Sequence, residues 1–144
     1  MPLGDPHGGN FTYTDEGLPL ESFVVSVPSR DPRKAVAFYR DTLMMDVVLE
    51  SEDEMIVRRA RCTIRIFRSA SAGVDTGIFI GVDDPYAFHR RMIDEGVRFK
   101  MDPKRLSFGV ATSFFDSDDN ILYAVETGAL PYEEHKNGCS YCGA

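Results

Sequence analysis

The chain has 144 residues and a formal net charge of −7, with 43% hydrophobic and 27% charged residues. This length suits one domain with a substantial core, and the acidic balance disfavours nucleic acid as a partner, because phosphate binding requires a basic surface. No apolar run reaches the ~20 residues that a membrane-spanning helix needs, and the first residues lack the basic and apolar regions of a signal peptide, so we expect a cytoplasmic protein without a membrane partner.

The predicted elements begin after residues 1–20, which are rich in Gly, Pro and Asp and are expected to form a flexible arm. Residues 21–27 read as a strand. A helix is predicted over residues 31–45, because Asp31 is a good N-cap and Pro32 suits the first helical position. Three short strands with turn-like breaks are expected next, at residues 46–51, 54–60 and 62–67.

The same order of elements then begins again. A strand is expected at residues 76–82, and a helix at 84–96 starts with Asp84 and Pro85 as the first helix starts with its own Asp-Pro pair. Three more strands follow, at residues 97–101, 108–116 and 120–126. The sequence therefore predicts an α+β fold with the order βαβββ twice. The expected organisation is one domain at residues 21–127, with modules at about 21–68 and 75–127, and a C-terminal tail at 128–144.

The motif "DSDDN" places Asp116, Asp118 and Asn120 at the first three ligand spacings of a calcium loop. Such a loop also needs Gly at its sixth position and Glu at its twelfth, and these positions hold Ile121 and Thr127. The residues that follow the motif read as a strand. We therefore predict a hairpin turn between the last two strands, in which Asp and Asn tolerate the tight backbone.

These features together resemble the vicinal oxygen chelate superfamily, which includes glyoxalase I, fosfomycin-resistance enzymes, extradiol dioxygenases and bleomycin-resistance proteins. The resemblance rests on the doubled βαβββ unit, on "AFYRDTL" in the first helix and on "FFDSDDNILYAVE" near the end, and it covers about residues 21–127. It implies that the two modules curl their strands into a half-open barrel cleft, and that the protein is a homodimer. The Gly and Pro of the family's last turn are replaced here by Asp119 and Ser117.

Where members of that superfamily hold a divalent metal, four side chains bind it, usually His, Gln or Glu from the first and last strands of each module. The resemblance places these positions at Val24, Arg65, Gly77 and Tyr123. Val and Gly offer no donor, Arg stays protonated, and Tyr, with an ordinary pKa near ~10, is a poor ligand at neutral pH. We therefore expect no metal and no other cofactor in the cleft.

Strand alternation indicates which side chains face the cleft instead. The predicted ligand-binding residues are Arg65, Phe67, Phe79, Tyr123, Ser113, Ile121 and Ser26. Together they would form a mostly apolar pocket with one fixed charge, which is typical of small-molecule sites. Arg65 either clamps a carboxylate or phosphate or stacks on an aromatic ring of the ligand, or it pairs with an acid such as Glu54 across the sheet.

The tail carries His135, Cys139 and Cys142, whose spacing suits zinc. A structural zinc needs four ligands, so the fourth would come from Cys62, a partner chain or water. A reversible disulfide and an inert tail are the alternatives. Three cysteines in the whole chain do not form a disulfide framework.

The leading functional hypothesis is metal-free binding of a small organic molecule, similar to bleomycin-resistance proteins. No catalytic residue is assigned, because no Ser-His-acid set is recognisable. One alternative is a metal-dependent lyase, isomerase or dioxygenase of the glyoxalase type, with Glu21, Glu54 or Glu126 as substitute ligands. Another is a sensor of metal or oxidant that uses the tail cysteines.

Overall fold

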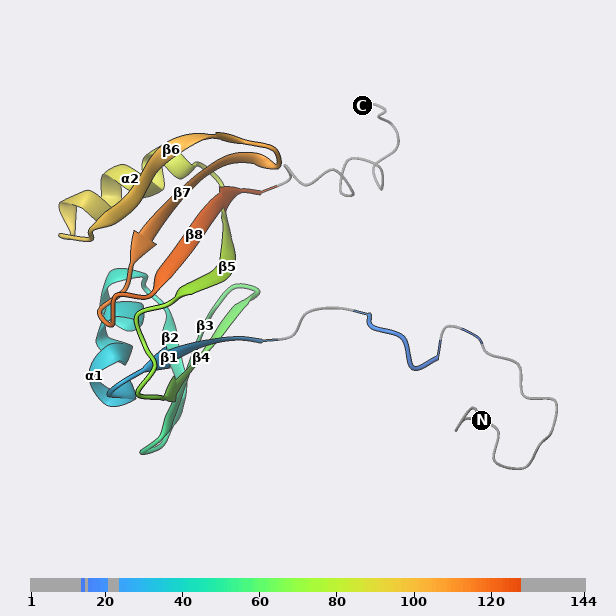
Figure 1. Cartoon of the computed structure of the whole chain (residues 1–144), viewed down its shortest axis with the longest axis vertical. Helices are drawn as coiled ribbons and strands as arrows, with labels where there is room; N and C mark the ends of the chain where they lie inside the picture. Colours follow the sequence, from blue (N-terminus) through green and yellow to red (C-terminus); the bar gives the residue numbers. More distant parts are fainter. Residues whose placement is uncertain (1–13, 15, 21–23, 128–144) are drawn as a thin grey trace.

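The computed structural model describes residues 14, 16–20 and 24–127 of the chain. This part contains two four-stranded sheets, each with a helix on one side (Figure 1). The tail with His135, Cys139 and Cys142 lies outside the described residues, as does most of the N-terminal arm. Among the residues described, no helix has the length and apolarity to span a membrane.

The first module forms the lower sheet in Figure 1. Its elements are β1 (Val25–Ser29), α1 (Pro32–Ala37), a helical turn η1 (Phe38–Thr42), β2 (Asp46–Glu50), β3 (Glu54–Arg59) and β4 (Cys62–Arg68). The strand order is β1-β4-β3-β2, in which β1 runs parallel to β4 and the other pairs are antiparallel.

The second module repeats this arrangement in the upper sheet. Its elements are β5 (Asp75–Val82), α2 (Pro85–Asp94), β6 (Phe99–Leu106), β7 (Gly109–Phe115) and β8 (Ile121–Glu126). The strand order β5-β8-β7-β6, with β5 parallel to β8, matches that of the first sheet strand for strand. The predicted α+β fold of two βαβββ modules is therefore confirmed.

Three elements differ from the sequence prediction. The first strand was predicted over residues 21–27, of which 21–23 lie outside the described residues, and β1 covers Val25–Ser29. Strand β6 continues beyond residue 101 and includes Pro103, which an edge strand tolerates because its outer amide groups have no ladder partner. The helix predicted over residues 31–45 is α-helical only as far as Ala37, and a π-helical turn follows. In that turn the amide of Leu43 donates to the carbonyl of Phe38 at 3.1 Å, five residues back.

The π-helical turn accompanies a contact with the other module. Tyr39, which it carries, is completely buried, and its hydroxyl donates to Oδ2 of Asp116 at 2.5 Å. The local sequence indicates only a helical period. It therefore could not predict the π-helical turn, a form that is frequent at functional sites.

One hydrophobic core runs through both modules. Buried core residues alternate along the strands of both sheets and include Val27, Val57, Ile64, Ile66, Phe114, Leu122 and Ala124. The ring of Phe38 stacks on that of Phe114 at 6.4 Å and so connects the first helix to the second sheet. Both helices lie on the left of the sheets in Figure 1, and the described residues place no helix over the opposite faces of the sheets.

The "DSDDN" motif forms the predicted hairpin turn between β7 and β8. The amide of Asp116 donates to the carbonyl of Asn120 at 3.0 Å, and Asp119 adopts a φ of 66°. The carboxylate of Asp116 accepts from the amides of Asp118 and Asn120, at 2.8 and 2.9 Å. The carboxylate therefore organises the turn itself.

The side chain of Asn120 anchors this turn to the rest of the molecule. Its oxygen accepts from the amides of Gly73 and Val74, in the linker between the modules, at 2.8 and 3.1 Å. Its nitrogen donates to the carbonyl of Pro28 in β1 at 2.8 Å. The motif thus holds the linker, the first strand and the last hairpin together, which is a structural role.

Candidate functional site

The residues predicted to bind a ligand fall into two groups, one on each sheet. The first group comprises Ser26, Arg65 and Phe67 of β1 and β4. The second group comprises Phe79, Ser113, Ile121 and Tyr123 of β5, β7 and β8. Strand alternation turns both groups away from the buried core. Within the described ranges, no hydrogen bond, ion pair or aromatic contact joins the two groups.

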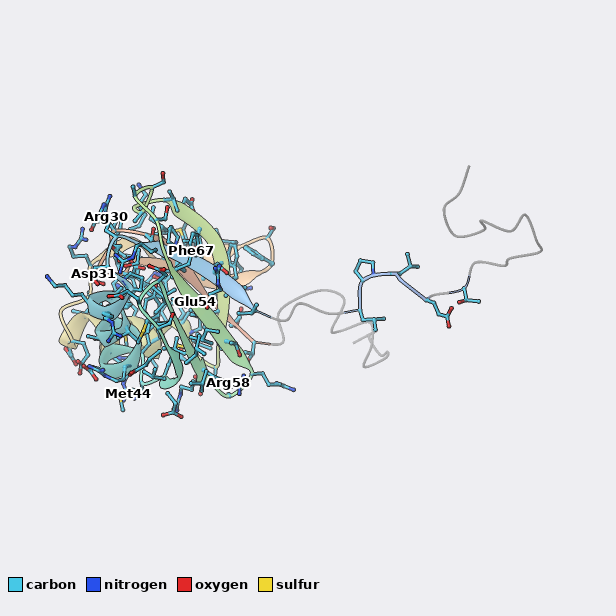
Figure 2. All side chains as sticks on the ribbon, turned by 90° about the horizontal axis from the view of Figure 1, so that it is seen from below. Arg30, Asp31, Met44, Glu54, Arg58 and Phe67 are labelled. Atoms are coloured by element: carbon cyan, nitrogen blue, oxygen red, sulfur yellow. The ribbon has the colours of Figure 1, made fainter. Side chains whose placement is uncertain are left out.

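Arg65 is the centre of the first group. It forms an ion pair with Glu54, as one of the sequence alternatives predicted, and a long hydrogen bond to the hydroxyl of Ser26 at 3.4 Å. Its guanidinium group also lies 4.9 Å from the centre of the Phe67 ring. Glu54 and Phe67 face each other across β3 and β4, and Figure 2 shows them side by side. The charge of Arg65 is therefore balanced within the chain.

An exposed aromatic stack forms the second group. The rings of Phe79 and Tyr123 stack with centroids 4.5 Å apart and planes inclined by 18°, and Phe108 meets Phe79 edge-on at 5.0 Å. Phe79 keeps 42% of its surface exposed. The hydroxyl of Tyr123 donates to Oδ2 of Asp75 at 2.7 Å. This hydrogen bond, with smaller contributions from burial and the charge of Asp75, raises the pKa of Tyr123.

The remaining two members of the second group differ in solvent exposure. Ile121 is half-buried beside Tyr123, whereas Ser113, which pairs with Tyr123 across β7 and β8, is only 1% exposed. Ser113 is therefore enclosed by its neighbours. Sequence reasoning missed Asp75 and Phe108. Asp75 shares the alternation of Phe79 and could have been found from it. Phe108 was expected to begin the strand predicted at residues 108–116, but β7 starts at Gly109, so Phe108 lies in the turn between β6 and β7, where alternation gives no signal.

The four positions that correspond to the superfamily's metal ligands do not fit a divalent metal. Val24 is apolar, and the position of a Cβ on Gly77 faces open space, so neither supplies a donor. Arg65 is cationic and held by a carboxylate. Tyr123 uses its hydroxyl to donate to Asp75. In the part of the chain described, no three His, Cys, Asp or Glu side chains converge as metal ligands would.

The acids considered as substitute ligands are engaged elsewhere or lie outside the structure. The carboxylate of Glu54 accepts from Arg65, and Oε2 of Glu126 accepts from the amide of Val110 at 2.8 Å. Glu21 lies outside the described residues. Cys62, considered as a fourth ligand for a tail zinc, is half-buried, and its burial raises the pKa of its thiol, which disfavours the thiolate that zinc requires.

A cavity of about 630 Å³ lies away from both groups, between the two modules on the side of the helices. Its walls come from the end of η1, the turn between β3 and β4, the end of β5, helix α2 and Thr127. None of the residues predicted to bind a ligand lines it. Because these segments meet only through the packing of one module on the other, sequence reasoning gave no indication of the cavity.

Comparison with solved structures identifies the fold. TnmS3, an antibiotic binding protein from Streptomyces sp. CB03234, is 22% identical, with 76% of this chain and 97% of that chain covered and a TM-score of 0.65. A bleomycin-binding protein from bleomycin-producing Streptomyces verticillus, complexed with copper(II)-bleomycin, is 18% identical over 76% and 98%, with a TM-score of 0.63. Lactoylglutathione lyase from Agrobacterium tumefaciens is 15% identical over 76% and 96%, with a TM-score of 0.66. At these identities the likeness shows the fold alone.

Sequence comparison identifies the family. No curated protein matches the chain at a significant level. A sequence profile matches residues 23–124, which include every described strand and helix except the last two residues of β8. The profile is that of the Glyoxalase/Bleomycin resistance protein/Dioxygenase superfamily, and the chain belongs to this superfamily.

Proposed function

We propose that this protein binds a small, planar organic molecule at the helix-free faces of its sheets, without a divalent metal. The observation that carries the proposal is the stacked pair Phe79 and Tyr123, which remains open to solvent. Exposed aromatic faces offer a large contact area with a preferred stacking geometry. The open space beside Gly77, on the same strand as Phe79, leaves room for a ligand at the edge of the stack.

The polar groups on these faces favour a ligand without a large net charge. Arg65 is balanced by Glu54 and already lies over Phe67, so it offers hydrogen bonds and a flat cationic surface rather than a free charge. Two proteins with the same fold are described as an antibiotic binding protein and as a complex with copper(II)-bleomycin. By analogy, we propose that this chain binds an organic molecule and does not convert it.

We also propose that the protein acts as a cytoplasmic homodimer. The two groups of candidate residues occupy separate sheets, and no hydrogen bond, ion pair or aromatic contact joins them within the described part of one chain. A second protomer is the simplest way to bring such groups together over one ligand. Sedimentation should then give twice the chain mass of 16.1 kDa. A monomer that binds ligand with full affinity would contradict this part of the proposal.

Metal content is the first test. Elemental mass spectrometry should find no stoichiometric divalent metal in the full-length protein or in a chain cut after Gly128. Metal retained by the shortened chain would contradict metal-free binding and support a glyoxalase- or dioxygenase-like enzyme. Metal lost with the tail would place it at His135, Cys139 and Cys142 and support the sensor alternative.

Ligand binding is the second test. A panel of small planar aromatic molecules is screened by thermal shift and titrated by calorimetry, and copper(II)-bleomycin, a much larger molecule, is tested separately. Because stacking and apolar burial by one aromatic ring contribute on the order of 1–3 kcal/mol, Phe79→Ala should weaken binding about tenfold or more. Tyr86→Ala removes an aromatic ring that is 50% exposed on α2, away from the sheet faces, and should have no effect. Equal losses in the two variants would contradict the proposed site.

A further inference from the structure

The cavity between the modules combines an apolar interior with cationic walls. Its apolar lining includes Leu43, Met45, Ile80, Val82, Phe88 and Met92. Met45 and Met92 are almost fully buried, whereas Arg59, Arg61 and Arg91 of the same lining are exposed. The methionine side chains therefore lie at the inner end of the cavity and the guanidinium groups lie near solvent.

The charges of this lining are unbalanced. Among the described residues, its lining contains one acid, Asp83, against three arginines. Arg59, Arg61 and Arg91 form no ion pair with any residue that the structure describes. Three cations around one cavity, with one carboxylate among the described lining residues, repel one another. An anion bound among them would relieve that repulsion and accept charge-assisted hydrogen bonds.

The backbone at the cavity wall is held in an unusual conformation. Met44 and Ala60, which both line the cavity, have φ angles of 60° and 54°. Among the described residues other than glycine, Asp119 in the β7–β8 turn is the third with a positive φ. The side chain of Arg59 donates to the carbonyl of Met44 at 3.4 Å and connects the two segments (Met44 is labelled in Figure 2). Such residues persist only where surrounding structure enforces them, and they concentrate at ligand sites.

We propose that this cavity is a second binding site, for a carboxylate that carries an apolar chain. Its volume of about 630 Å³ lies within the range of small-molecule sites. The carboxylate accepts hydrogen bonds from Arg61 and Arg91, because planar guanidinium groups match its two oxygens. The apolar chain packs between Met45 and Met92, whose flexible side chains adapt to ligands of different shape.

Titration calorimetry with the full-length protein tests the proposal, with decanoate as the probe and decanol as its neutral counterpart. Decanoate should bind, and decanol should bind at least tenfold more weakly. Arg61→Gln and Arg91→Gln should each weaken decanoate binding about tenfold, which corresponds to one charge-assisted hydrogen bond, and should leave decanol unaffected. Arg33→Gln removes the same charge from an exposed site on α1 outside the cavity and should change neither affinity.

A second variant tests the apolar part without removing charge. Ala87 lines the cavity from α2, so Ala87→Phe should fill it and weaken both probes, while thermal unfolding verifies that the variant is folded. The proposal is overturned if decanoate does not bind the wild-type protein, or if Arg61→Gln and Arg91→Gln bind it as tightly as Arg33→Gln does. A loss of decanoate binding in Phe79→Ala, with none in the arginine variants, would place the probe on the sheet faces instead and equally overturn it.

Discussion

Asn120 shows how much of the fold depends on a single side chain. It is fully buried, and its amide group bonds to Gly73, Val74, Pro28 and Asp116. Asn120→Ala would remove all four hydrogen bonds, of which those to Pro28 and Asp116 are buried, and each buried hydrogen bond that is lost costs about 1–3 kcal/mol. We expect the free energy of unfolding to fall by about 3 kcal/mol or more, measured from the urea midpoint.

Ser117 provides the matched control for that experiment. It lies in the same turn but is exposed, so Ser117→Ala should change the free energy of unfolding by less than about 0.5 kcal/mol. If both variants lost the same stability, the turn as a whole, rather than the buried amide, would be the stabilising feature.

Tyr39 makes the stability of the protein sensitive to pH in the alkaline range. Burial, followed by the charge of Asp116 and the hydrogen bond to it, raises the pKa of Tyr39 well above 10.0. In the unfolded chain the same phenol ionises near pH ~10. The stability that Tyr39 contributes is therefore complete below about pH 10 and is lost as the pH rises from there towards the folded pKa.

The corresponding variant is Tyr39→Phe. It should be less stable than the wild type by about 1–2 kcal/mol at neutral pH, because the buried carboxylate of Asp116 loses a donor. Its urea midpoint should fall less than that of the wild type between about pH 9 and pH 11, because it has no phenol to ionise at this position. Parallel pH profiles for the two proteins would contradict the assigned cause.

Gly77 determines the local path of strand β5. Its φ is 68°, and the pairing of β5 with β8 shifts register between Asp75 and Phe79, on either side of it. A Cβ at Gly77 would touch nothing within 4 Å, so Gly77→Ala introduces backbone strain without a clash. We expect a loss of about 1–2 kcal/mol in urea unfolding, and a smaller loss for Gly77→Asn, because Asn tolerates this conformation better. Equal stability of Gly77→Ala and wild type would show that the strand can adopt another path.

Elements formed by local interactions were predicted from sequence, whereas features that depend on contacts between distant residues were not. Strand alternation and the Asp-Pro helix starts are local, so the order of elements, the sheet faces and the pairing of Arg65 with Glu54 were accessible from sequence. The π-helical turn carries Tyr39, whose hydroxyl contacts Asp116 in the other module, and local periodicity does not report such a contact. Phe108 was missed because the strand predicted over residues 108–116 begins one residue later, which leaves Phe108 in a turn. The arginines of the cavity were missed because the junction between the modules carries no repeating pattern.

At the level of the whole molecule, the two modules should unfold together. Their contacts include the stack of Phe38 on Phe114 and the hydrogen bond from Asn120 to Pro28, and one buried cluster includes residues of both sheets. Neither sheet can therefore lose its packing without exposing part of the other. A domain of this size with one core is expected to unfold in a single cooperative transition.

Native-state hydrogen exchange can test this cooperativity strand by strand. Amides of β3 and β7, in different modules, should exchange through openings of the same free energy. Asn120→Ala changes only the second module and its anchor points, yet it should lower the opening free energy of both strands equally. If the modules were independent, the variant would weaken β7 and leave β3 unchanged. Each module would then keep its own stability, and the shared core would contribute little to holding the sheet faces and the cavity in place.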